Sequence, residues 1–111
     1  MSTALAYKGR ADGVAYTLKR NGIALTAEDM ALITKHEFKF NGNYYNSEDH
    51  ASLFSIDVDS ATITIYPGLI TDVVATTDRK VEIIVYDASR PQGFVWGTIS
   101  LKVSGDAVPA T

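Results

Sequence analysis

The chain has 111 residues, of which 46% are hydrophobic and 21% are charged, and its formal net charge at pH 7 is −3. This length and composition predict one domain around a single core, and the acidic balance, with no run of more than two basic residues, argues against nucleic acid and anionic lipid as partners. The absence of cysteine excludes disulfides, thiolate metal sites and cysteine nucleophiles, and it fits a protein made in a reducing cytoplasm.

The start of the chain does not have the features of a targeting segment. MSTALAYKGR (1–10) lacks both the leading positive charge and the long apolar core of a signal peptide. No apolar run approaches the roughly 18 residues that are needed to cross a bilayer. We therefore expect neither secretion nor membrane insertion.

Most of the chain has the patterns of short β-strands. Apolar and polar residues alternate, or apolar residues run together, in segments bounded by turn-forming residues. In chain order the predicted strands are residues 14–20, 33–40, 43–46, 53–58, 61–66, 81–87 and 94–103. The segment 81–87 is the most strongly apolar and is expected to lie centrally in a sheet.

Turn and helix signals separate these strands. Asn21-Gly22 and Asn41-Gly42 predict tight hairpins because both residue types accept positive φ. Residues 26–31 are the one place where a short helical turn is expected, with Thr26 as the cap and Asp29 in the position of the acidic residue of a capping box. The apolar part of 69–80 has no clear pattern.

The stretch YDASRPQGFVWG (86–97) is expected to contain the connection between the last two strands. Arg90-Pro91 favours an extended residue before the proline, and Gly93 accepts positive φ, so a compact Pro-Gly break is predicted. Alternation then assigns Val95, Gly97, Ile99, Leu101 and Val103 to the core face, and Phe94, Trp96, Thr98, Ser100 and Lys102 to the opposite face. Gly97 beside Trp96 indicates a bulge or a close backbone approach.

These elements predict an all-β fold. About seven short strands with turn signals between them indicate an antiparallel β-sandwich with an immunoglobulin-like layout, and a small closed barrel is the alternative. The predicted domain spans 1–111, with a core at 14–103 and extended tails at 1–12 and 104–111.

Metal and catalytic motifs are weak throughout the chain. His36 alternates with phenylalanines and His50 lies in SEDHAS (47–52), but no HxH or HxxxH spacing occurs, so a solvated loop is the simpler interpretation of SEDHAS. Asp57 and Asp59 share a strand face without the loop of an EF-hand, which favours an edge strand protected by charge. With no nucleophile elbow, carboxylate pair or phosphate loop, we expect no enzyme, no metal and no cofactor.

Aromatic residues and one arginine are the candidates for contact with a partner. Tyr44 and Tyr45 follow a hairpin turn, and at least one of them must face outward from a strand. Trp96, in a restart of the last strand after the Pro-Gly signal, either covers the end of the sandwich or forms a hot spot. Arg90 and Phe94 flank the same signal, which completes the candidate set.

Three stretches resemble one family. YTLKRNGIALT (16–26), SIDVDSATITIYPGLI (55–70) and VEIIVYDASRPQGFVWGTISLKV (81–103) are similar to the hairpins of the N-terminal domain of bacteriophage upper-baseplate proteins and related tail-fibre attachment modules. The likeness covers most of residues 14–103. It implies a virion protein, assembled in the host cytoplasm, and as a site it implies only the loop from Pro91 to Trp96.

The resemblance leads to a functional hypothesis with two alternatives. The leading hypothesis is a structural protein, without enzymatic activity, that docks on tail, baseplate or neck components as an adaptor and is present in many copies or as a homo-oligomer. The first alternative is a decoration protein bound to the major capsid protein. The second is a carbohydrate-binding module in which Tyr44, Tyr45 and Trp96 form a coplanar stacking platform.

Overall fold

A computed structural model describes residues 3–71 and 73–105. Its strands are β1 (Ala4–Tyr7), β2 (Val14–Thr17), β3 (Lys19–Arg20), β4 (Ile23–Ala24), β5 (Ile33–Phe40), β6 (Asn43–Asn46), β7 (Phe54–Asp57), β8 (Thr62–Ile65), β9 (Arg79–Asp87) and β10 (Arg90–Ser104). One short helix, α1 (Ala27–Ala31), and two 3₁₀ turns, η1 (Ala51–Leu53) and η2 (Pro67–Leu69), complete the described elements.

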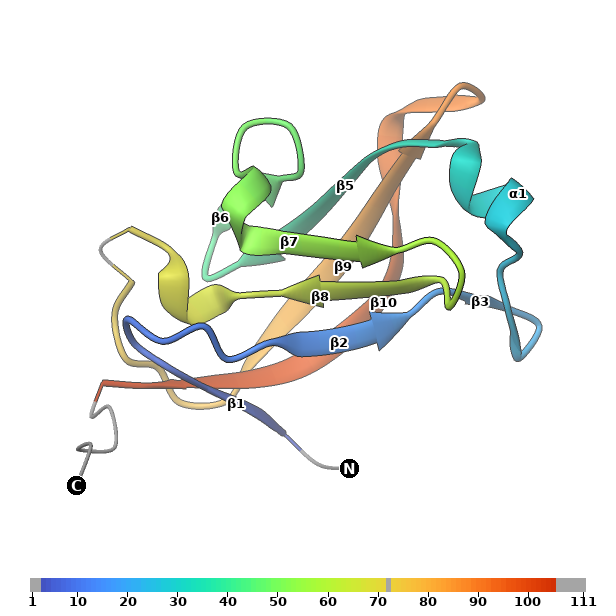
Figure 1. The fold of residues 1–111 in the computed structure, drawn as a ribbon. Coiled ribbons are helices and arrows are strands. Elements are labelled where there is room, and N and C mark those ends of the chain that lie inside the picture. Colours follow the sequence, from blue (N-terminus) through green and yellow to red (C-terminus); the bar gives the residue numbers. More distant parts are fainter. Residues whose placement is uncertain (1–2, 72, 106–111) are drawn as a thin grey trace.

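The strands form two facing sheets and a small ribbon (Figure 1). The five-stranded sheet has the order β1-β10-β9-β5-β6, and the three-stranded sheet has the order β2-β8-β7, with β3 and β4 paired separately. This arrangement confirms the predicted all-β sandwich and the central place of β9. Both sheets are open at their edges, so the closed barrel was wrong, and the described residues hold ten strands rather than about seven.

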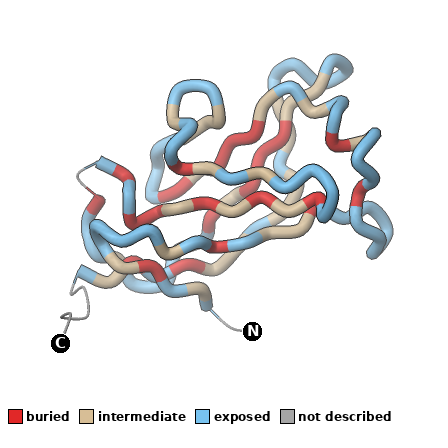
Figure 2. Tube along the Cα trace, viewed as in Figure 1, coloured by how far each residue is buried: buried red, intermediate tan, exposed pale blue. Residues whose placement is uncertain are grey.

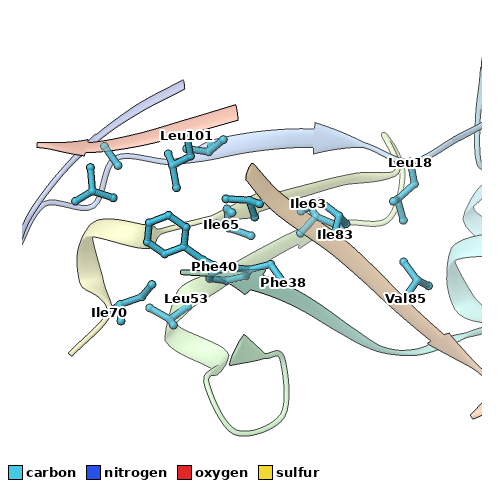
Figure 3. Close-up of a cluster of buried hydrophobic side chains, with 14 of the residues drawn as sticks. Leu18, Phe38, Phe40, Leu53, Ile63, Ile65, Ile70, Ile83, Val85 and Leu101 are labelled. Atoms are coloured by element: carbon cyan, nitrogen blue, oxygen red, sulfur yellow. The ribbon is translucent and has the colours of Figure 1, made fainter. Parts of the chain in front are cut away.

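The core lies between the two sheets (Figure 2). Phe38 and Phe40 of β5 and Ile63 and Ile65 of β8 are almost completely buried and face one another in Figure 3, with Leu101 of β10 beside them. Each side chain of this size contributes roughly 1.5–3 kcal/mol when it is fully buried. The alternation predicted for β5 and β8 therefore positions the inner faces of both sheets.

The local turn signals are confirmed. Asn21, Gly22, Asn41 and Gly42 all have φ between 53° and 82°, as a two-residue hairpin turn with positive φ requires. The Thr26 side chain accepts a hydrogen bond of 3.1 Å from the backbone N–H of Asp29, which caps α1.

The prediction of an extended N-terminal tail was wrong. β1 pairs in parallel with the far end of β10, with Ala4 opposite Leu101 and Tyr7 opposite Ser104. Ala6 is fully buried in the core. Locally, residues 4–7 form a weak strand signal, and the strand forms because β10 offers an edge almost a hundred residues later in the chain. The predicted C-terminal tail beyond residue 105 lies outside the described residues.

The connection before the last strand also differs from the prediction. The turn consists of Ala88 and Ser89, and β10 already begins at Arg90, so Pro91 to Gly93 belong to the strand rather than to a break in it. The pairing of β10 with β9 shifts once between Arg90 and Phe94 and again between Val95 and Gly97.

The second shift is a β-bulge that reverses the predicted faces around Trp96. Val95 lies opposite Ile84 and Gly97 lies opposite Ile83, so Trp96 is the extra residue. Val95, predicted in the core, is 50% exposed, whereas Phe94 and Trp96 pack against the core. Beyond the bulge the prediction holds, and the bulge beside Gly97 was itself predicted.

No helix in the described part of the chain is long and apolar enough to cross a membrane.

Candidate contact surface

Three of the predicted contact residues lie together on β10. The guanidinium carbon of Arg90 is 3.8 Å from the centroid of the Phe94 ring, and the Phe94 and Trp96 rings are 5.5 Å apart. Phe94 and Trp96 are half-buried, and Arg90 is exposed. We call these three residues the β10 aromatic patch. A guanidinium over a ring, next to a second ring, is held by cation–π and aromatic attraction.

The patch is fixed at both ends by hydrogen bonds. Asp87 accepts from the backbone N–H of Arg90 at 2.8 Å and from the Ser89 hydroxyl at 2.9 Å, and its other oxygen lies 3.5 Å from the Arg90 guanidinium. The hydrogen bond from Ser89, together with Arg90, lowers the pKa of Asp87. At the other end, the Trp96 indole N–H donates to the backbone oxygen of Lys19 at 3.2 Å, which joins β10 to the β3–β4 ribbon.

A tyrosine on β9 supports the bulged part of β10 from the outer face of the sheet. The Tyr86 hydroxyl donates to Glu37 at 2.6 Å, and the Lys35 ammonium lies 4.2 Å from the Tyr86 ring centroid. This hydrogen bond, burial and the charge of Glu37 raise the pKa of Tyr86 to about 12. Gly93 has a φ of +77° and lies against the Tyr86 ring. A Cβ at this position would be 2.7 Å from the nearest ring carbons. Glu37 is one of the two buried polar or charged residues among those that the structure describes, and sequence reasoning did not single it out.

The two remaining candidates, Tyr44 and Tyr45, lie on β6 at the far edge of the sheet, separated from β10 by β9 and β5. Tyr44 is 55% exposed, with the Lys39 ammonium 5.4 Å from its ring centroid. Tyr45 is half-buried, and its ring centroid lies 5.2 Å from that of Phe38 in the core. The described structure therefore does not bring Tyr44, Tyr45 and Trp96 onto one exposed platform.

Tyr45 instead borders two neighbouring hollows. One, of about 220 Å³, is lined by Tyr45, Asp49, His50, Ser52, Leu53, Leu69, Ile70 and Thr71. The other, of about 170 Å³, is lined by Phe40, Asn41, Asn43, Tyr45, Ile70, Thr71, Val73 and Val74. We call the pair the Tyr45 trough. Sequence reasoning missed it because five of its thirteen lining residues come from the 69–80 segment, which has no recognisable pattern.

The histidines have structural roles. His36 is 6% exposed, burial lowers its pKa to about 4, and among the described residues its Nδ1 is the one buried side-chain polar atom without a partner. His50 accepts a 3.2 Å hydrogen bond from the backbone N–H of Asn46, whose own side chain accepts from the backbone N–H groups of Glu48 and Asp49. SEDHAS is thus an ordered turn.

The aspartates that were considered as calcium ligands form part of a turn. Asp57 accepts hydrogen bonds from the backbone N–H groups of Asp59 at 3.0 Å and Ser60 at 3.3 Å, which shapes the connection from β7 to β8. Within residues 3–71 and 73–105, no group of three or more His, Asp or Glu side chains could hold a metal ion.

Comparison with known proteins gives no relative: no protein-family model matches the chain, and no curated protein matches it.

Proposed function

We propose that this protein is a bacteriophage virion protein without enzymatic activity that docks on a tail, baseplate or neck component through the β10 aromatic patch. The virion assignment depends on the resemblance of the hairpins in residues 14–103. The observation that supports the surface is the ordered stack of Arg90, Phe94 and Trp96, with the guanidinium 3.8 Å from the Phe94 centroid.

Preorganisation is the physical argument for this surface. Arginine and tryptophan are, with tyrosine, the residue types most enriched at binding hot spots, and ordering a flexible arginine on binding costs conformational entropy. Here Asp87 and Phe94 already hold Arg90 in the free protein, and Lys19 holds Trp96. The neighbouring ribbon adds an exposed apolar side chain, since Ile23 is 73% exposed.

Cross-linking mass spectrometry on purified virions tests the proposal. Lys19 is held next to Trp96, whereas Lys102 lies on the distal half of β10, where it is opposite Leu5 of β1. We expect cross-links from Lys19 to a tail, baseplate or neck protein in excess of those from Lys102. Absence of the protein from virions would refute the virion role, and cross-links to the major capsid protein would assign it to decoration instead.

A matched pair of variants tests the patch itself. Arg90→Glu should weaken incorporation into particles at least tenfold, because it reverses the charge of the one cation in the patch and removes its contact with the Phe94 ring. Lys102→Glu makes the same charge change on the same strand, away from the patch, and should leave incorporation unchanged. Equal effects of the two substitutions would refute the patch as the docking surface.

The Tyr45 trough is the observation that favours carbohydrate binding as a second candidate. It combines an aromatic ring with the amides of Asn41 and Asn43 and the hydroxyls of Ser52 and Thr71, and no lysine or arginine lines it. Such a lining suits a neutral sugar rather than an anion. Titration with neutral oligosaccharides should shift the amide NMR signals of Asn43 and Thr71, and Asn43→Ala should abolish the shifts while Tyr44→Ala, on the opposite face of β6, should not.

A further inference from the structure

The outer edge of β7 carries backbone groups that form no hydrogen bond within the described residues. The N–H of Tyr66 donates to the oxygen of Leu53 at 3.0 Å, which makes Leu53 and Tyr66 a hydrogen-bonded pair. Since bonded and non-bonded pairs alternate in antiparallel strands, Ser55 and Asp57 also bond to β8. The backbone groups of Phe54 and Ile56 therefore point away from β8, toward the open edge of the sheet.

The other side of β8 confirms this alternation independently. Leu18 donates to Ala61 at 2.8 Å, so Ala61, and with it Ile63 and Ile65, form hydrogen bonds with β2. The residues between them bond to β7. The edge assignment of Phe54 and Ile56 thus rests on two separate hydrogen bonds.

Two of the outward groups are already engaged. The N–H of Phe54 donates to the oxygen of Ala51 in η1, and the oxygen of Val58 accepts from Ala61 in the following turn. The groups without a described partner are, in order, the Phe54 oxygen, the Ile56 N–H, the Ile56 oxygen and the Val58 N–H. The edge therefore presents an acceptor, a donor, an acceptor and a donor.

Two other sheet edges are each covered at one residue by their own chain. On β6, His50 binds both backbone groups of Asn46, accepting from its N–H at Nδ1 and donating its own N–H to the Asn46 oxygen. On β1, the Tyr7 N–H donates to Asp12 and the Tyr7 oxygen accepts from Arg10. Natural sheets protect their edges in such ways, and among residues 3–71 and 73–105 no such cover lies along the middle of β7.

We propose that β7 is a self-association edge, at which a second copy of this chain adds its own β7 in antiparallel orientation with Ile56 opposite Ile56. The order of free groups is self-complementary in this register. Each Ile56 exchanges two hydrogen bonds with the other Ile56, and the Phe54 oxygen of each copy accepts from the Val58 N–H of the other. The pairing is isologous, as twofold dimers require.

The two outward backbone groups that already form hydrogen bonds within the chain determine both the register of the pairing and the kind of molecule that can pair with β7. In the proposed register the Phe54 N–H lies opposite the Val58 oxygen of the second copy. Each of these groups already forms a hydrogen bond within its own chain, so neither backbone group is left without a partner. A shift by two residues would place the Ile56 oxygen opposite the used Phe54 N–H. An unrelated extended peptide would likewise leave its own groups unpaired at both positions, which is costly when they are buried.

The side chains fit the same register. Asp57, the charged residue on the exposed face of β7, lies opposite Ser55 of the second copy rather than opposite another Asp57. On the inner face, Val58, which is 43% exposed, lies opposite the half-buried Phe54 of the second copy. Pairing therefore avoids repulsion between like charges and covers an exposed apolar side chain.

Engineered cysteines test the register, because the natural chain contains none. Ser55→Cys and Asp57→Cys proteins are mixed and oxidised; in the proposed register these positions form a non-hydrogen-bonded pair with Cα atoms about 4.5 Å apart, within disulfide range. We expect the mixed disulfide in at least tenfold excess over either homodimer. Dominance of the Ser55→Cys homodimer, or yields equal to those of a Ser89→Cys control on the β9–β10 turn, would overturn the proposal.

Charge at Ser55 provides a second test that leaves the core intact, since this side chain is exposed. Ser55→Glu faces Asp57 of the second copy twice per dimer and should weaken self-association about fivefold, whereas Ser55→Lys should strengthen it by a similar factor. Sedimentation equilibrium measures both. The self-association proposal would be refuted by a wild-type chain that stays monomeric up to millimolar concentration. It would also be refuted if the two substitutions changed the strength of self-association in the same direction. The test uses purified protein, so its outcome is independent of any role in a particle.

Discussion

Gly97 and Tyr16 make one of the closest side-chain fits in the described chain. A Cβ at position 97 would overlap the Tyr16 hydroxyl oxygen and lie 2.8 Å from the ring carbon that bears it. Tyr16 is half-buried and packs against the core from β2. The glycine therefore allows the bulged strand of one sheet to approach the other sheet.

Gly97→Ala should lower the free energy of unfolding by about 1–3 kcal/mol, because Tyr16 must move away from the new methyl group. Urea denaturation measures the change. The double variant with Tyr16→Phe should recover part of the loss, since the overlapping oxygen is removed, and additive effects of the two substitutions would contradict this account.

The His36 imidazole makes stability depend on pH. Its pKa is about 4 in the folded protein and 6.5 in the unfolded chain, so folding favours the neutral ring. The contribution of the neutral ring to the free energy of unfolding is fully present above pH 6.5. It is lost as the pH falls toward 4, by up to about 3 kcal/mol in total.

His36→Gln, which cannot titrate, should therefore flatten the decline in unfolding free energy between pH 6.5 and 5, above the range in which most carboxylates titrate. Denaturant titrations across this range test it. His50→Gln, at the histidine that is bonded to Asn46, serves as the control and should retain the decline. An unchanged slope in His36→Gln would show that burial of His36 is not the cause.

Among the elements, the β3–β4 ribbon projects from the two main sheets, joined to them at its base by Leu18, which donates to the Ala61 oxygen at 2.8 Å. It pairs only with itself in the described structure, and an isolated two-stranded hairpin is at best marginally stable in water. The indole of Trp96 supplies an anchor from β10 through the backbone oxygen of Lys19.

Trp96→Phe keeps an aromatic ring but removes this donor. We expect faster amide hydrogen exchange in residues 19–24 and a loss of about 1 kcal/mol in unfolding free energy. Thr98→Val, an exposed change on the same strand, should alter neither. Unchanged exchange in the ribbon would mean that packing alone holds it in place.

For the whole molecule, β1 links the two ends of the described chain. It adds a parallel strand to the C-terminal part of β10 and places Ala6, which is fully buried, in the core, while the adjacent Leu5 is 48% exposed. Neighbouring residues on β1 thus have opposite environments, as alternation in a strand requires.

This difference predicts contrasting effects of the same substitution. Ala6→Glu should destabilise the fold by about 3 kcal/mol or more, because it places a carboxylate in the core without a partner. Leu5→Glu, on the outer face, should change stability by less than about 1 kcal/mol. Thermal unfolding compares the two, and equal tolerance would mean that β1 does not pair as described.

Local chemistry explains how much could be predicted from the sequence. The Asn-Gly turns, the Thr26 cap and the alternation of β5 and β8 each depend on residues a few positions apart, and all of them were predicted correctly. The bulge beside Gly97 was also indicated by the sequence. The sequence did not indicate the exact position of the bulge. The one extra residue in β10 moves Val95 out of the core and Phe94 toward it, opposite to the predicted faces.

The sequence by itself therefore determined the all-β class, the central strand and most hairpins, because these follow from short-range periodicity and turn preferences. Only the tertiary structure decided that residues 4–7 complete a sheet, that Arg90, Phe94 and Trp96 gather apart from Tyr44 and Tyr45, and that β7 keeps an uncovered edge. Each of these depends on which strands become neighbours, and that is set by packing between segments far apart in the chain.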